Sequence, residues 1–172
     1  LQSRLQGVNT ALIQCLIGES NSVLRQVSDI PRLFRRTNRD TPNKPCGYVT
    51  SLLEAVQVFY KKHHDHPQTP LWLQFFFSDI TKQYYSSVAE VLTSVQKTEE
   101  SLRRLKKARD RSTSQATVSP NDRRPGDDDK IRLQLLIDVR AFFKGVEQMG
   151  VKTSSIEKLS ELLMLVETTQ RS

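Results

Sequence analysis

Residues 84–105 read YYSSVAEVLTSVQKTEESLRRL, and the spacing of their apolar side chains decides the fold class. The apolar positions recur in alternating steps of four and three: Tyr84, Val88, Val91, Val95, Leu102 and Leu105. The polar residue Thr98 fills the one position of this row between Val95 and Leu102. Such steps place the side chains in one row along an α-helix. No Pro or Gly interrupts the chain from Leu71 to Arg109, and Thr69-Pro70 is a typical helix start. The pattern predicts one continuous helix from about Thr69 to Arg109, with a length on the order of 60 Å.

The remaining sequence shows the same helical periodicity and no strand-type alternation. A first helix is indicated by an apolar row that weakens once and ends before Pro31: Leu1, Leu5, Val8, Leu12, Cys15, Val23, Val27 and Ile30. A second helix is expected at about 48–62, a fourth from Asp127 to a left-handed cap at Gly150, and a fifth from a capping box at Ser154. The expected fold is all-α, an elongated bundle of about five helices with one long helix.

The composition is that of a soluble globular protein rich in helix-forming residues. The 172 residues include 37% hydrophobic and 26% charged residues, with only 6 Gly and 7 Pro. The net charge of +7 is concentrated in two blocks. Residues 1–49 carry 7 basic and 3 acidic side chains, and residues 97–126 carry 9 and 4. Basic patches of this kind attract anionic partners but do not decide the fold.

We expect residues 1–172 to form a single helical domain. Residues 110–126, DRSTSQATVSPNDRRPG, contain almost no large apolar side chain, so we expect a disordered loop within the domain. The chain begins at Leu1 without a methionine and already in helical register. It is therefore expected to be a piece of a longer protein.

A short basic stretch at 30–49, IPRLFRRTNRDTPNKPCGYV, is the first candidate interaction site. If residues 31–38 form a helix, its apolar face holds Leu33 and Phe34, and its other face is basic. The residues of that basic face are Arg32, Arg35, Arg36 and Arg39. Two interpretations remain open: the arginines bind an external anionic partner, or they pair with carboxylates and helix-end carbonyls at a corner of the bundle. We expect at least part of the face to point outward.

A second basic face is expected near the end of the long helix. It is formed by Arg104, Lys107 and Arg111, opposite Leu102 and Leu105. Glu99–Arg103 and Glu100–Arg104 have the spacing of ion pairs within a helix. Because charge runs of this kind are commonly just solvated, this face is a secondary candidate.

The sequence offers no candidate catalytic, cofactor or metal site. It contains no phosphate-binding glycine loop, no G-x-S-x-G and no H-E-x-x-H motif, so an enzyme is not expected. His63, His64 and His66 lack the spacing of a helical metal site. Cys15 lies in the apolar row of the first helix and is expected to be a small core residue. The longest uncharged apolar run, LWLQFFFS, is far short of the ~20 residues that span a bilayer.

The isoelectric point of about 9.6 leaves a basic helical nucleic-acid-binding module as the alternative function. The basic blocks offer no interleaved aromatic residues for base stacking and match no groove-reading motif. A protein-binding domain is therefore the preferred interpretation, and no nucleic-acid partner is expected.

Four runs of the sequence resemble one known family. They are IPRLFRRTNRDTP at 30–42, YVTSLLEAV at 48–56, YYSSVAEVLTSVQKTEESLRRLKKAR at 84–109 and DDDKIRLQL at 127–135. All four are similar to the C-terminal region of subunit two of the conserved oligomeric Golgi complex. The runs IPRLFRRTN and EESLRRLKKAR are specific, since neither is a generic helix pattern, and the resemblance spans most of the chain.

The resemblance implies a role in vesicle tethering on the cytosolic face of the Golgi, in retrograde transport between cisternae. It implies a helical-rod fold of the tethering-complex type, peripheral to the membrane, with no catalytic activity, cofactor or small-molecule substrate. Other subunits of the complex are the implied partners. The arginine faces add acidic trafficking proteins or an anionic membrane surface as candidates, on the basis of charge rather than of the resemblance.

Overall fold

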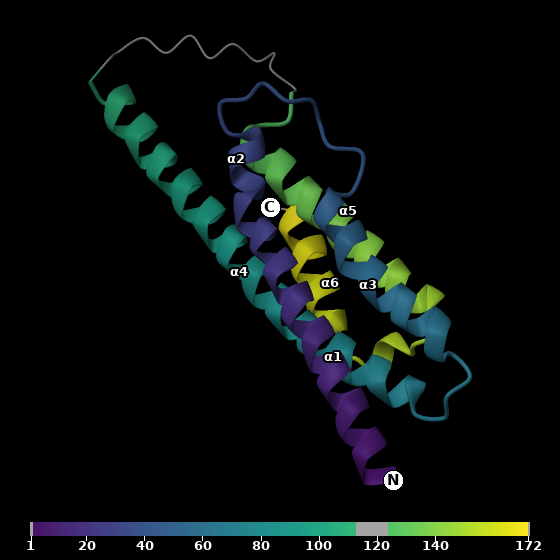
Figure 1. The fold of residues 1–172 in the computed structure, drawn as a ribbon. Coiled ribbons are helices and arrows are strands. Elements are labelled where there is room, and N and C mark those ends of the chain that lie inside the picture. Colours follow the sequence, from purple (N-terminus) through teal and green to yellow (C-terminus); the bar gives the residue numbers. More distant parts are fainter. Residues whose placement is uncertain (1, 113–123, 172) are drawn as a thin grey trace.

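The structure, a computed structural model, describes residues 2–112 and 124–171, and every regular element in these ranges is helical (Figure 1). The α-helices are α1 (Gln2–Leu24), α2 (Ile30–Phe34), α3 (Gly47–His63), α4 (Thr69–Asp110), α5 (Asp127–Gln148) and α6 (Leu159–Thr168). Three 3-10 helices join or end them: η1 (Arg25–Asp29), η2 (Thr153–Ser155) and η3 (Thr169–Arg171). The predicted all-α bundle with about five main helices, one of them long, is confirmed.

Helix α4 is a continuous helix of 42 residues and the spine of the bundle. Its apolar row is buried where it contacts α1, η1, α5 and α6, at Tyr84, Val88, Val91 and Val95. The C-terminal third of α4 diverges from the other helices (Figure 1), and all residues from 100 to 112 are exposed. Thr69 is not the cap that the sequence suggested. Gln68 holds that position, and the Thr69 hydroxyl instead donates to the carbonyl of His63 at the end of α3.

The N-terminal rod runs through α1, η1 and α2, and its buried row differs from the predicted one. Leu12 and Cys15 are exposed, and the side chains of Leu1, Leu5 and Val8 lie outside the described part of the chain. The residues that face the bundle are Ile13, Ile17, Ser20, Leu24, Val27, Ile30 and Phe34. The sequence offers two adjacent rows. The row through Cys15 leads on to exposed Glu19 and Ser22, whereas the other continues without interruption into η1 and α2.

Pro31 does not break the rod at Ile30 as predicted. Ile30 keeps right-handed helical geometry, and Pro31 lies in the first turn of α2. Proline is tolerated there because the backbone N–H groups of a first turn make no hydrogen bond within the helix. The chain changes helix type earlier, in the 3-10 turn η1.

The C-terminal helices follow one prediction and contradict another. Gly150 has φ of 72°, so the left-handed end after α5 is confirmed. The capping box at Ser154 is wrong, because Ser154 lies in η2 and α6 begins only at Leu159. Between them Ile156 is extended and 4% exposed, so its burial in the core interrupts the helix that the sequence suggested.

Most of the segment predicted to be a disordered loop, 110–126, lies outside the residues that the structure describes, so the loop remains a prediction. Asp110 is the last residue of α4, and α5 begins at Asp127. Within the two described ranges, no helix is both long enough and apolar enough to cross a membrane.

The packing of α3 against α5 requires a glycine, and this generates a prediction. A Cβ on Gly145 would clash with Leu53, whose Cγ would be 3.2 Å away, whereas a Cβ on Gly18 of α1 meets open space. Gly18→Ala should raise the free energy of unfolding by up to about 1 kcal/mol through helix propensity. Gly145→Ala should lower it, because overpacking costs about 1–3 kcal/mol and outweighs the same gain. Urea unfolding of both variants measures the difference. Equal stabilisation by the two alanines would contradict the close approach of α3 and α5.

Candidate interaction surface

The basic stretch after Ile30 is helical for a shorter distance than predicted. Helix α2 ends at Phe34, Arg35 is extended, and Arg36 and Asn38 have φ of 58° and 52°. The Thr37 hydroxyl donates to the carbonyl of Leu33 at 2.6 Å and so satisfies one of the last helical carbonyls. The expected helix at 31–38 is therefore wrong, and the four candidate arginines do not share one helical face.

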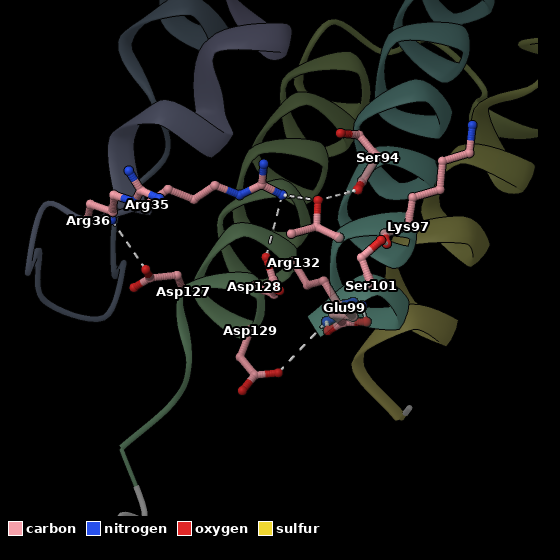
Figure 2. Close-up of polar contacts among 11 residues, drawn as sticks. Arg35, Arg36, Ser94, Lys97, Glu99, Ser101, Asp127, Asp128, Asp129 and Arg132 are labelled. Carbon is pink, nitrogen blue, oxygen red and sulfur yellow. Dashed lines mark hydrogen bonds and ion pairs between the residues drawn. The ribbon is translucent and has the colours of Figure 1, made fainter. Parts of the chain in front are cut away.

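Arg35 points into the bundle and joins three helices (Figure 2). Its Nη2 donates to Thr98 Oγ1 of α4 at 3.3 Å and lies 3.6 Å from Asp128 Oδ1 of α5. The Arg35 side chain is 34% exposed. Burial raises the pKa of Asp128 above its ordinary value, and the positive charge of Arg35 offsets part of that increase. Arg35 is therefore a brace at the corner where α2 ends and α5 begins.

The other three arginines of the stretch are exposed. The Arg32 side chain is 86% exposed and lies 3.7 Å from Asp29, a solvent-exposed pair of little energetic weight. Arg36 and Arg39 are held through their backbones: the Arg36 N–H donates to Asp127 at 3.4 Å, and Lys130 donates to the Arg39 carbonyl at 2.7 Å. Their guanidinium groups extend from a backbone that α5 fixes in place.

A row of polar residues along α5 holds the whole segment 35–46. Besides Asp127 and Lys130, Gln134 donates to the Lys44 carbonyl at 2.9 Å, and Asp138 accepts from the Cys46 N–H at 2.7 Å. These four residues of α5 follow one another in steps of three, four and four, so they lie on one side of the helix. This row was not predicted from the sequence. Its signal was Gln134 and Asp138, two polar residues in an otherwise apolar register.

Asp138 lies in a buried polar cluster. Its side chain is fully buried, and near it the hydroxyls of Tyr48 and Tyr84 are hydrogen-bonded at 2.8 Å. Burial raises the pKa of Asp138, and hydrogen bonds from the Cys46 N–H and Gln134 offset part of the rise. Burial also raises the pKa of both tyrosines and brings that of the Cys46 thiol to about 12. Asp138, Tyr48 and Tyr84 are therefore buried structural groups.

A second ion pair ties α4 to α5 below Arg35. Arg132 donates through both terminal nitrogens to the two carboxylate oxygens of Glu99, each at 2.6 Å, and the Arg132 side chain is 12% exposed. Hydrogen bonds from Arg132 lower the pKa of Glu99. Glu99 therefore pairs across the bundle, where the sequence suggested Arg103 as its partner. The Glu100–Arg104 pair is confirmed, at 2.5 Å.

The secondary basic face lies on the free end of α4. Arg104, Lys107 and Arg111 are all exposed there. So are Leu102 and Leu105, which are 51% and 66% exposed. Among the residues that the structure describes, no neighbouring helix covers either set.

The three histidines lie beside aromatic rings. His66 stacks on Trp72 with ring centres 4.6 Å apart, and the His63 ring lies 4.6 Å from that of Phe59. Within the described part of the chain, no group of three or more His, Cys, Asp or Glu side chains is placed to hold a metal ion.

Comparison with known proteins gives one consistent match. A family model described as "COG complex component, COG2, C-terminal" matches residues 1–139. The conserved oligomeric Golgi complex subunit 2 of Drosophila melanogaster is 40% identical over 97% of this chain, and that of Homo sapiens is 37% identical over 92%. The Arabidopsis thaliana protein of the same name is 26% identical over 99%. The chain spans 24% and 22% of the fly and human proteins, and no solved structure matches it.

The two environments of the arginines predict different effects of charge reversal. Arg35→Glu places a carboxylate against Asp128 and removes the donor to Thr98, so it should lower the free energy of unfolding by about 1–3 kcal/mol. Arg32→Glu, three residues earlier in α2 and in solvent, should change it by less than about 0.5 kcal/mol. Thermal and urea unfolding of both variants provide the measurement. Equal melting temperatures would show that Arg35 is not a brace.

Proposed function

The chain belongs to the family of the C-terminal region of conserved oligomeric Golgi complex subunit 2, and we propose that it is a non-catalytic protein-binding domain of that vesicle-tethering complex. In this proposal it acts on the cytosolic face of the Golgi membrane, in retrograde transport between cisternae. Its partners are other subunits of the complex and acidic proteins of the transport machinery. The relatives are named as subunits of the complex, which supports the proposal, whereas the nucleic-acid alternative rests on the basic charge of the chain.

The exposed corner at Arg32, Arg36 and Arg39 is the contact surface that we propose. The observation that carries it is the combination of exposed guanidinium groups with a backbone fixed by Asp127 and Lys130. A fixed backbone reduces the ordering entropy lost when a partner binds. Arginine is well suited to carboxylates, because its planar group donates two parallel hydrogen bonds. An acidic protein segment therefore fits this corner.

Charge reversal at the corner tests the proposal in the full-length subunit. Arg36→Glu with Arg39→Glu should leave the melting temperature nearly unchanged, since neither side chain is buried. It should reduce, severalfold, the co-purification of other subunits or the retrograde recycling of a Golgi-resident enzyme in cells lacking the endogenous subunit.

The matched control is Lys144→Glu with Lys152→Glu, two exposed residues elsewhere on the domain with the same change in charge. This control should leave both readouts at the wild-type level. If the corner variant behaves like the control in both assays, the corner is not the contact surface.

A further inference from the structure

The apolar row of α4 continues beyond the bundle that covers it. Tyr84, Val88 and Val95 are fully buried and Val91 is 5% exposed, yet the next two apolar members of the same row are 51% and 66% exposed. Between the two parts stands Thr98, half-buried under Arg35. The row keeps its steps of four and three throughout. Its exposed part is therefore a continuation of the helix-packing surface on which no helix of the described chain packs.

The apolar row of α4 becomes exposed where the helices packed against it end. Helix α2 stops at Phe34 and α5 starts at Asp127, and Arg35, Asp128 and Thr98 meet at that level (Figure 2). From Glu100 on, α4 continues for about three turns with every residue exposed. Residues 113–123, which follow in the sequence, include one Val and no Leu, Ile, Met or aromatic residue. That segment has too few apolar side chains to replace a packed helix.

One side of α4 is open between the bundle and Leu102. It is formed by residues of α4, among them Ser94, Lys97, Ser101 and Leu102. Figure 2 shows Ser94, Lys97 and Ser101 along this helix. A helix seated on Leu102 and Leu105 can therefore extend toward the bundle along this side of α4.

The charge of the free end selects the occupant. Between residues 100 and 112 there are two acidic residues, Glu100, which pairs with Arg104, and Asp110. Six basic residues outnumber them around the two leucines: Arg103, Arg104, Lys106, Lys107, Arg109 and Arg111. A second copy of the chain would bring two such segments together, and like charges oppose that contact. Membrane insertion requires a broad apolar face with several large side chains, whereas this end has two leucines and no aromatic residue. An acidic amphipathic helix satisfies both the leucines and the charge.

We propose that the free end of α4, residues 100–112, is a docking site for an acidic amphipathic helix of a partner protein. The partner's apolar residues pack on Leu102 and Leu105, and its carboxylates pair with the surrounding Lys and Arg side chains. The inference rests on the proposed protein-binding function but concerns a surface separate from the corner at Arg36 and Arg39. It names the chemistry of the partner at that surface.

A designed peptide tests the proposal on the 172-residue chain. The probe is a peptide of about three heptads that forms an amphipathic helix, with Leu at positions a and d of each heptad and Glu at the flanking positions. The reference is a peptide of the same composition with a scrambled sequence. Leu102→Gln with Leu105→Gln keeps charge and helix propensity and should weaken binding at least about tenfold. Lys107→Glu with Arg111→Glu should weaken it and reduce its salt dependence. Circular dichroism should show unchanged helicity, since all four side chains are exposed.

The control is a second exposed apolar pair on the same helix. Leu71→Gln with Phe75→Gln alters side chains that are 64% and 51% exposed near the other end of α4, and it should leave peptide affinity unchanged. Equal binding of the scrambled peptide, or equal loss in the control, would overturn the proposal in favour of unspecific charge attraction. Binding of phosphatidylserine vesicles that depends on Leu102 and Leu105, or dimerisation through them, would overturn it in favour of a membrane or a second copy. The variant Arg36→Glu with Arg39→Glu should bind the peptide with wild-type affinity. The docking site on α4 and the contact surface at Arg36 and Arg39 can therefore be refuted independently of each other.

Discussion

The burial of one apolar row on α4 is the contact on which the rest of the structure depends. Tyr84 lies near its centre, with the ring of Phe142 of α5 5.4 Å away and that of Tyr48 of α3 6.1 Å away. Each large side chain buried in this way contributes about 1.5–3 kcal/mol. Helices α1, α5 and α6 all contact α4, so their positions follow from this one helix. Its length also takes it beyond them.

Polar contacts decide how the covered part of the spine ends. Arg35 and the Arg132–Glu99 pair join α2, α4 and α5 at the same level, and the polar row of α5 fixes the connection between α2 and α3. Partly buried pairs of this kind contribute less to stability than to the choice of one arrangement over its alternatives. They hold the exposed arginines on a fixed backbone while α4 continues alone.

The sequence could predict what local periodicity encodes. The all-α class, the extent of α4 and the left-handed Gly150 follow from spacing and from backbone chemistry that involve only neighbouring residues. The position of Arg35 could not be predicted in this way, because its partners Thr98 and Asp128 lie 63 and 93 residues away. In α1 the predicted row is apolar from Leu1 to Cys15, whereas the row that packs against the bundle becomes apolar only at Ile13. The early part of the helix therefore pointed to the wrong row. The start of α6 was missed because burial of Ile156 outweighs a good local capping signal.

In this structure α4 is one continuous helix whose last turns stand clear of the bundle. Spin labels at Ser86→Cys and Ala108→Cys, both exposed, test it by pulsed electron resonance in a Cys15→Ser background. Cys46 is half-buried with a thiol pKa of about 12, so it should not be labelled. A continuous helix predicts one narrow distribution of distances centred at about 33 Å, from about 1.5 Å per residue. A broad distribution centred at a clearly shorter distance would show that α4 bends or unravels where its neighbours end, and would contradict the account.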